Sequence, residues 1–129
     1  PRSSFALIPA DIDNAECAKV LLNPSGSIHA FITKRELTAE EKSDFGFGGE
    51  AIGFFILRQE DVPRFVTLYE NNESTYRPVL WEIPFTEFAR NTPLHPWNVS
   101  QEGCFEIDTQ EDYSTALNHF QSHLDQYQL

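Results

Sequence analysis

Two histidines near the C-terminus have the spacing and chemistry of a metal site. His119 and His123 are four residues apart, so on a helix they face the same way, and Asp112 falls on the same side. Two imidazoles and a carboxylate are ligands that zinc accepts. The same spacing also arises by chance on polar helix faces, and no His-Glu-x-x-His pattern accompanies it. We therefore predict no physiological metal site and a fold that forms without metal.

Cys104 is a candidate catalytic nucleophile, because a thiol beside a histidine can be activated by that base. It lies in a predicted strand over residues 104–107, next to Phe105, where an inert buried thiol is expected. Cys17 is the other cysteine, and this low number favours two free thiols over one long-range disulfide. We expect a protein that is not an enzyme, and keep a small enzyme using Cys104 or a histidine as an alternative.

One glycine-rich stretch, residues 45–49, invites comparison with phosphate-binding loops. Such loops follow a strand and open a helix, whose N-terminal amides bind the anion. Here the predicted order is reversed, Lys42 is the nearby base, and Glu50 adds repulsion. We interpret the stretch as turn glycines or as a mobile hairpin-like loop that exposes Phe45 or Phe47. No nucleotide or other cofactor is predicted.

A tryptophan in a proline-bounded loop has the chemistry of a protein-binding anchor. Trp97 lies in a predicted long loop over residues 91–103, and several acidic residues follow it. An exposed tryptophan ringed by carboxylates would suit a basic protein, whereas packing of Trp97 into the core is the alternative. The candidate partner-binding residues are Trp97, Glu102, Glu106, Asp108, Glu111 and Asp112.

Acidic residues are concentrated in the second half of the chain. The formal net charge is −11; residues 1–58 hold 8 acidic and 6 basic residues, whereas residues 59–129 hold 12 and 3. No Lys or Arg follows Arg90. A field of this sign repels nucleic-acid phosphates and anionic lipid surfaces, and it speeds encounter with a basic protein. Solubility is the alternative reason for the acidity.

These side chains are expected to be positioned by one domain over residues 1–129. A chain of this length, 40% hydrophobic, can bury one core. Strands are predicted over residues 5–8, 28–33, 51–57, 76–83 and 104–107. Helices are predicted over residues 11–22 and 85–90, and two more are predicted to start at Thr38 and after Asp61. Short strands among helices favour an α+β fold, with a mainly antiparallel sheet of about 4–5 strands, over a doubly wound parallel sheet.

The last predicted helix has the clearest pattern. Thr109 and the acidic residues after it are typical of a helix start. An apolar stripe follows at spacings of four and three, formed by Tyr113, Leu117, Phe120, Leu124 and Tyr127. We predict a long amphipathic helix that packs across the sheet.

In general character the chain resembles bacterial immunity proteins that neutralise basic toxins, because it is small, acidic and without a catalytic motif. The likeness is one of class and covers no motif. We expect an inhibitor-type, protein-binding domain with a basic protein partner. A cytoplasmic location is expected, because the chain has neither an apolar run of about 20 residues nor a signal peptide. The alternatives are the small enzyme and a secretion chaperone or adaptor domain whose acidity serves only solubility.

Overall fold

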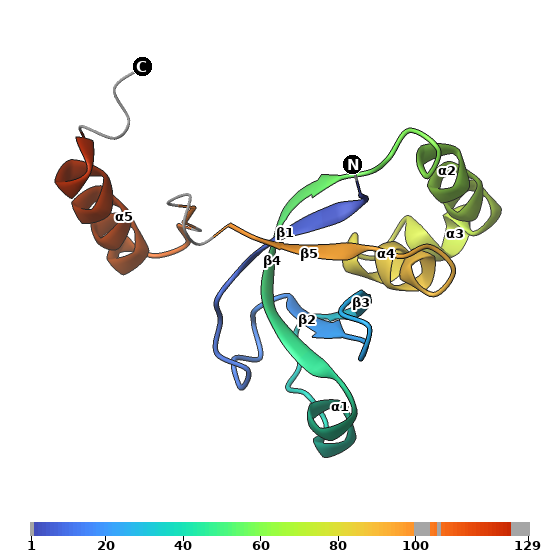
Figure 1. The fold of residues 1–129 in the computed structure, drawn as a ribbon, viewed down its shortest axis with the longest axis horizontal. Helices are drawn as coiled ribbons and strands as arrows, with labels where there is room; N and C mark the ends of the chain where they lie inside the picture. Colours follow the sequence, from blue (N-terminus) through green and yellow to red (C-terminus); the bar gives the residue numbers. More distant parts are fainter. Residues whose placement is uncertain (1, 100–103, 106, 125–129) are drawn as a thin grey trace. The chain divides into compact units, whose positions relative to one another are not determined.

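A mixed sheet with surrounding helices occupies residues Pro1–Asn98, and one further helix lies in residues Val99–Leu129 (Figure 1). Contacts within the chain divide it into these two units, which we call unit 1 and unit 2. The computed structural model describes residues 2–99, 104–105 and 107–124. The single domain expected over residues 1–129 stays a prediction.

Strands and helices alternate irregularly along unit 1. The strands are β1 (Ser4–Ile8), β2 (Lys19–Leu22), β3 (Ile28–Ile32), β4 (Gly46–Ile56) and β5 (His95–Asn98). The helices are α1 (Ala39–Asp44), α2 (Val62–Asn71), α3 (Glu73–Tyr76) and α4 (Glu82–Ala89), and unit 2 contains α5 (Gln110–Ser122). These elements confirm the predicted α+β fold.

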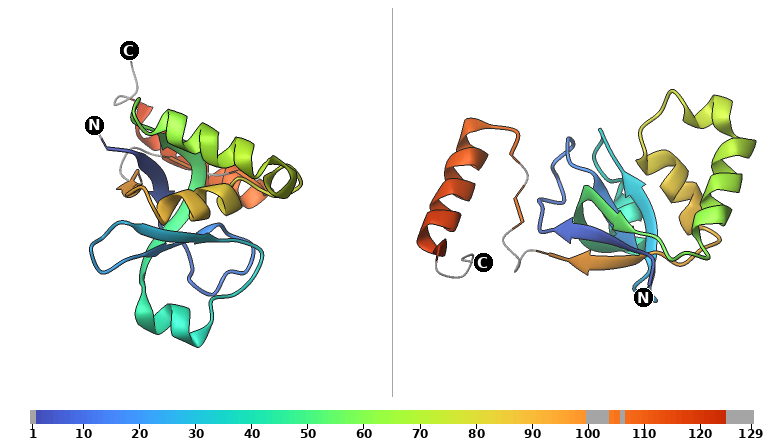
Figure 2. Two further views of the ribbon diagram at one scale, coloured as in Figure 1. Left: turned by 90° about the vertical axis from the view of Figure 1, so that its right-hand side faces the viewer. Right: turned by 90° about the horizontal axis from the view of Figure 1, so that it is seen from above.

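The sheet of unit 1 has the strand order β3-β2-β4-β1-β5 (Figure 2). All neighbouring strands are antiparallel except β1 and β5, which are parallel. The strand predicted over residues 51–57 corresponds to β4, which lies at the centre of the sheet but already starts at Gly46. The glycine-rich stretch is therefore mostly strand, and its interpretation as a hairpin-like loop is wrong. Phe45 and Phe47 are half-buried, and Phe45 stacks on His29 with ring centroids 3.9 Å apart.

Both outer strands of the sheet are protected against pairing with another chain. On β3, the Phe31 amide donates to Thr86 Oγ1 at 2.9 Å, and the Ile28 amide donates to the Leu94 carbonyl at 2.8 Å. On β5, Pro96 has no amide hydrogen to offer. Groups that would otherwise recruit a neighbouring strand are thus satisfied or missing at these edges.

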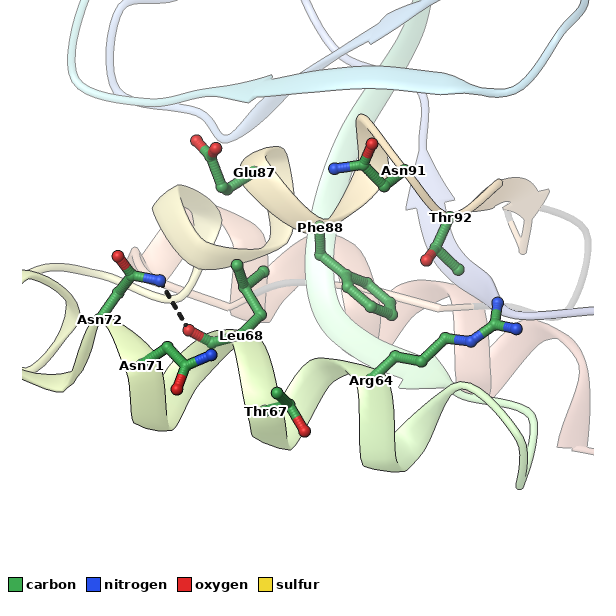
Figure 3. A pocket seen from close by; sticks show the side chains of 9 residues that line it. All are labelled: Arg64, Thr67, Leu68, Asn71, Asn72, Glu87, Phe88, Asn91 and Thr92. Atoms are coloured by element: carbon green, nitrogen blue, oxygen red, sulfur yellow. Dashed lines mark hydrogen bonds between the residues drawn. The ribbon is translucent and has the colours of Figure 1, made fainter.

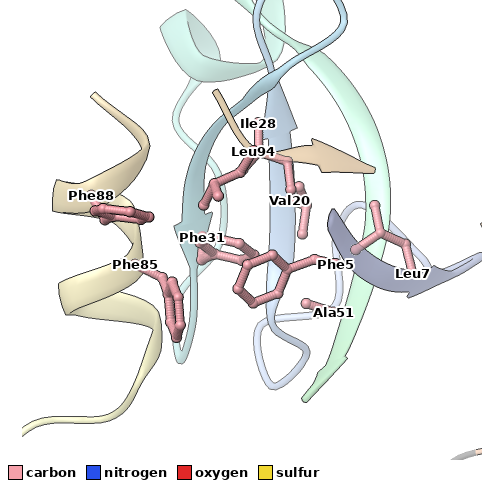
Figure 4. Close-up of a cluster of buried hydrophobic side chains, with 9 residues drawn as sticks. All are labelled: Phe5, Leu7, Val20, Ile28, Phe31, Ala51, Phe85, Phe88 and Leu94. Carbon is pink, nitrogen blue, oxygen red and sulfur yellow. The ribbon is translucent and has the colours of Figure 1, made fainter. Parts of the chain in front are cut away.

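The core of unit 1 lies between the sheet and α4 (Figure 4). Its buried side chains are Phe5, Leu7, Val20, Ile28, Phe31, Ala51, Phe85, Phe88 and Leu94. Phe5 is 0% exposed and contacts the rings of Phe31, Phe55, Trp81 and Phe85. Helix α4, predicted only as a turn or more over residues 85–90, thus provides the helical cover of this core. The predicted packing of the C-terminal helix across the sheet stays a prediction.

Four predicted elements are wrong. Residues 11–22 form turns and then β2 instead of a helix, since the side chains of Asp11 and Asn14 accept nearby backbone amides. Residues 76–83 do not form a strand, because α3 ends and α4 begins there. Cys104, Phe105 and Ile107 are not in a strand, and the predicted loop over residues 91–103 contains β5.

The helix starts predicted at Thr38 and after Asp61 are confirmed. Thr38 and Glu41 form a reciprocal capping box at α1: the Glu41 amide donates to Thr38 Oγ1 at 3.1 Å, and the Thr38 amide donates to Glu41 Oε2 at 2.9 Å. Helix α2 begins after Asp61 as predicted, but the Asp61 side chain makes no capping bond. Among the described residues no helix is long and apolar enough to span a bilayer.

Candidate functional site

The acidic residues around the start of α5 are held by local hydrogen bonds. The Asp112 amide donates to Thr109 Oγ1 at 3.1 Å, and the Thr109 amide donates to Asp112 Oδ2 at 2.9 Å. These bonds from Thr109 lower the pKa of the Asp112 carboxyl below its usual range. Asp108 and Glu111 are exposed beside it. We call Asp108, Glu111 and Asp112 the acidic cluster of unit 2.

Helix α5 carries a half-exposed apolar face. Tyr113, Leu117, Phe120 and Leu124, which we call the apolar stripe, are 50%, 40%, 38% and 59% exposed. Ala116 is buried. The predicted amphipathic helix is confirmed over residues 110–122, and its apolar side chains remain largely accessible.

The predicted partner-binding residues fall into two groups. Asp108, Glu111 and Asp112 lie together at the start of α5, whereas Trp97 belongs to β5 in unit 1. Trp97 is 46% exposed, so it is not packed into the core. Glu102 and Glu106 lie outside the described residues. The structure thus brings together three of these residues, and it shows Trp97 as an exposed aromatic side chain of unit 1.

The two C-terminal histidines pack against each other instead of converging on a common point. Their rings stack with centroids 4.5 Å apart, and His123 Nδ1 is 2.8 Å from the carbonyl oxygen of His119. The ring of Phe105 lies beside His119, with centroids 4.9 Å apart. Within residues 2–99, 104–105 and 107–124, no three potential metal ligands gather.

Both cysteines are free thiols, as predicted. Cys17 is buried, and burial raises the pKa of its thiol, with Glu50 adding to the effect. Cys104 is half-buried and makes no hydrogen bond to a histidine in the part of the chain that the structure describes, so its expected burial within a strand is wrong. At Cys17 the effects of burial and of the nearby carboxylates on the thiol pKa outweigh that of the nearby Lys19 ammonium, so this thiol is not activated as a nucleophile.

A groove between α2 and α4 was not predicted. The two helices pack through the stacked rings of Phe65 and Phe85, 4.3 Å apart, and beside this contact they leave a volume of about 400 Å³. Phe88 and Leu68 line it with carbon, and the remaining lining side chains are polar or charged (Figure 3). Arg64, Thr67 and Asn71 follow one another at spacings of three and four residues on α2, and this polar face is the sequence signal that could have indicated the groove.

A buried carboxylate ties the start of β1 to the start of α2. Asp61 is 0% exposed; its Oδ2 accepts from Ser3 Oγ at 2.6 Å and from Arg58 Nε at 2.9 Å. The Arg58 amide in turn donates to Ser3 Oγ at 2.9 Å. The Arg58 and Ser3 hydrogen bonds hold the pKa of the Asp61 carboxyl below its usual range. Since Ser3 and Asp61 are 58 residues apart, the arrangement closes the fold of unit 1.

We expect Asp61→Asn to lower the melting temperature at pH 7 by about 5 °C or more. The folded-state pKa of Asp61 is depressed, so its stabilisation is present above the unfolded pKa and is lost as the pH falls through the folded pKa. The difference between wild type and variant should therefore shrink as the pH falls below about 4. Glu60→Gln is the control, because Glu60 pairs with Arg58 at 3.0 Å but is 65% exposed. Melting curves from pH 7 to pH 2.5 measure both variants; an equal loss in both would contradict the structural role of Asp61.

The end of β4 exposes further apolar side chains. The pairing of β1 with β4 shifts its register between Phe5 and Leu7, so that Ala6 lies opposite three residues of β4. Gly53, the middle one of these three residues, has a φ of +78°. Phe54 beside it is 70% exposed. This irregular stretch explains why part of the apolar run at the end of β4 faces solvent.

Comparison with protein-family models, with curated proteins and with solved structures finds no match for this chain.

Proposed function

We propose that this chain is a protein-binding domain whose acidic C-terminal unit engages a basic protein, as an inhibitor or immunity protein engages a basic toxin. A cytoplasmic location is part of this proposal. The partner is defined by its chemistry: a positively charged surface that also offers an apolar groove. No catalytic role is assigned to the chain.

One observation carries the proposal: unit 2 combines charge of a single sign with an accessible apolar helix face. Residues 99–129 contain 6 acidic residues and no Lys or Arg. In the same unit the apolar stripe of α5 is 38–59% exposed. Amphipathic helices bind by inserting such a stripe into a groove, and surrounding charges select the partner and speed the encounter.

Other features of the described residues support this choice over the enzyme alternative. The groove between α2 and α4 is lined by neither cysteine nor histidine. Cys104 makes no hydrogen bond to a histidine among the described residues, and His119 and His123 stack on each other. A chaperone or adaptor whose acidity serves only solubility would not need an apolar stripe beside the acidic residues.

The test starts from a partner captured from the source cell, whose association is then measured at low and high salt. We expect reversal of Glu102, Glu106 and Asp108 to lysine to slow association about tenfold or more at low salt. High salt should reduce this difference, because it screens the long-range field. Asp112 is left intact because it caps α5, and melting curves should verify that each variant folds.

The matched control reverses three exposed acids of unit 1, Glu16, Glu36 and Glu70, and so changes the net charge equally. It should slow association less, because the charges are not in unit 2. Equal effects of the two triple variants, or capture of an acidic partner, would overturn the proposed role of unit 2. Trp97→Ala should speed dissociation if this exposed ring is a contact anchor.

Leu117→Ala tests whether the apolar stripe of α5 contacts the partner or stabilises the folded chain itself. If the stripe contacts the partner, the variant should speed dissociation and leave the free energy of unfolding within about 0.5 kcal/mol of wild type. His119→Ala is the comparison on the same helix. A loss of about 2 kcal/mol or more from Leu117→Ala would mean that the stripe is buried within the folded chain, and it would contradict its role in binding.

A further inference from the structure

We propose that the groove between α2 and α4 binds a carboxylate attached to an apolar body, either a free organic acid or the C-terminal residue of a peptide. The site lies entirely in unit 1 and does not depend on the proposed role of unit 2. Its volume of about 400 Å³ is within the range of small-ligand pockets.

The apolar part of the ligand is inferred from the two apolar side chains that line the groove, Phe88 and Leu68. Phe88 is 4% exposed and has its place fixed by packing, because its ring contacts Phe65 edge-on with centroids 5.3 Å apart. Leu68 adds an aliphatic surface from α2. Because little of Phe88 is exposed, the apolar part of a ligand would cover mainly the half-buried Leu68 side chain and the edge of the Phe88 ring.

The carboxylate is defined by donors at one end of the groove. In Figure 3, Arg64 and Thr92 lie at one end and Asn72 lies at the other. Thr92 is 3% exposed, and its hydroxyl has no hydrogen-bond partner among the described residues. This hydroxyl lines the groove and can donate to a carboxylate oxygen placed there.

Arg64 supplies the positive charge. Its closest carboxylate oxygen is Asp61 Oδ1 at 3.7 Å, whereas Asp61 is held more closely by Arg58 at 2.9 Å. Arg64 therefore keeps most of its donors for a ligand. The other charged side chain of the lining, Glu87, is paired with Arg90 at 2.9 Å. The charge that remains for a ligand is the Arg64 guanidinium, whose planar fork matches a carboxylate.

The polar side chains between the two ends suit a peptide better than a bare acid. Asn71 and Asn91 carry amides that both donate and accept, and neither amide has a hydrogen-bond partner among the described residues. Such amides could bond the last peptide group of a chain whose terminal carboxylate reaches Arg64. An added peptide group should therefore increase the affinity if the natural ligand is a peptide C-terminus, and it should not increase the affinity if the ligand is a free organic acid.

The probes are 3-phenylpropionate and its neutral amide, titrated into the full chain at pH 7 and followed by chemical shifts of the backbone amides. We expect the acid to shift the amides of Arg64, Phe88 and Thr92 in a saturable way, and its amide to bind at least about tenfold more weakly. Equal binding of both probes, or no saturable shift in this groove, would overturn the proposal.

Substitutions of Arg64 and Thr92 test whether these side chains donate hydrogen bonds to the carboxylate of the ligand. Arg64→Gln should weaken binding of the acid about tenfold, and Thr92→Val, which conserves volume, should weaken it severalfold while leaving the melting temperature unchanged or higher. Arg77→Gln is the matched control, because Arg77 is 81% exposed and pairs only with Glu73 in the described part of the chain, at 3.8 Å. Unchanged affinity in Arg64→Gln, or an equal loss in Arg77→Gln, would contradict the assignment.

A second pair of probes identifies the source of the carboxylate. N-acetylglycylphenylalanine and its C-terminal amide carry the same aromatic group with an added peptide segment. Tighter binding of the peptide acid than of 3-phenylpropionate would indicate a peptide C-terminus, and weaker binding would indicate a small organic acid. If the peptide amide bound as tightly as the peptide acid, recognition of the carboxylate would be refuted.

Discussion

Replacing Gly49 by alanine should destabilise the protein by about 2–6 kcal/mol, since it combines backbone strain with overpacking. The φ of Gly49 is +107°, and a Cβ would lie 2.3 Å from the carbonyl oxygen of Ile8, a backbone atom of β1. These two strands are neighbours at the centre of the sheet, with Ile8 opposite Glu50. The methyl group therefore cannot be accommodated without shifting β1 against β4.

Gly53→Ala is the matched control for Gly49→Ala. Gly53 lies in the same strand with a φ of +78°, but no atom lies within 4 Å of the position of its Cβ. It should cost about 1–2 kcal/mol, the backbone term alone. Urea unfolding of both variants measures the difference. Equal destabilisation would mean that the close approach of β1 and β4 at Gly49 does not exist in solution.

The second large effect is expected at Phe5. Phe5→Ala should lower the free energy of unfolding by about 3–5 kcal/mol, because it removes a ring that is 0% exposed. Centroids of Phe31 and Phe85 lie 4.8 and 4.9 Å from that of Phe5, so the cavity would open at the contact between the sheet and α4. Since small domains are stable by only about 5–15 kcal/mol, this variant should be marginally folded at 37 °C.

Phe54→Ala is the control for Phe5→Ala, because it removes a phenylalanine ring from the surface and not from the core. Phe54 is 70% exposed, so its loss should change the free energy of unfolding by at most about 0.5 kcal/mol. Chemical unfolding followed by tryptophan fluorescence suits both variants, because Trp81 stacks on Phe5 with centroids 5.8 Å apart. A loss at Phe54 as large as that at Phe5 would contradict the placement of the core.

Features that depend on neighbours in sequence could be predicted from the sequence. The capping boxes at Thr38 and Thr109 join residues three positions apart, so the local pattern is sufficient to place the starts of α1 and α5. The spacing of apolar residues after Thr109 likewise determined the amphipathic character of α5. The absence of Lys and Arg after Arg90, on which the proposed function depends, also required no structure.

Features that depend on distant partners were decided by the tertiary structure. Val20, Leu21 and Leu22 have apolar side chains that suit either a helix or a strand, and they became part of β2 because β3 and β4 bond to both sides of this strand. In the sequence Asp61 looks like a helix cap, yet its hydrogen bonds go to Ser3, 58 residues away, and to Arg58. The groove between α2 and α4 likewise depends on how two helices pack, and no single segment carries that information. Local hydrogen bonds and the spacing of apolar residues act within a few positions of the sequence. The burial of side chains and the pairing of strands involve distant residues, so they determine the final conformation only when the whole chain has folded.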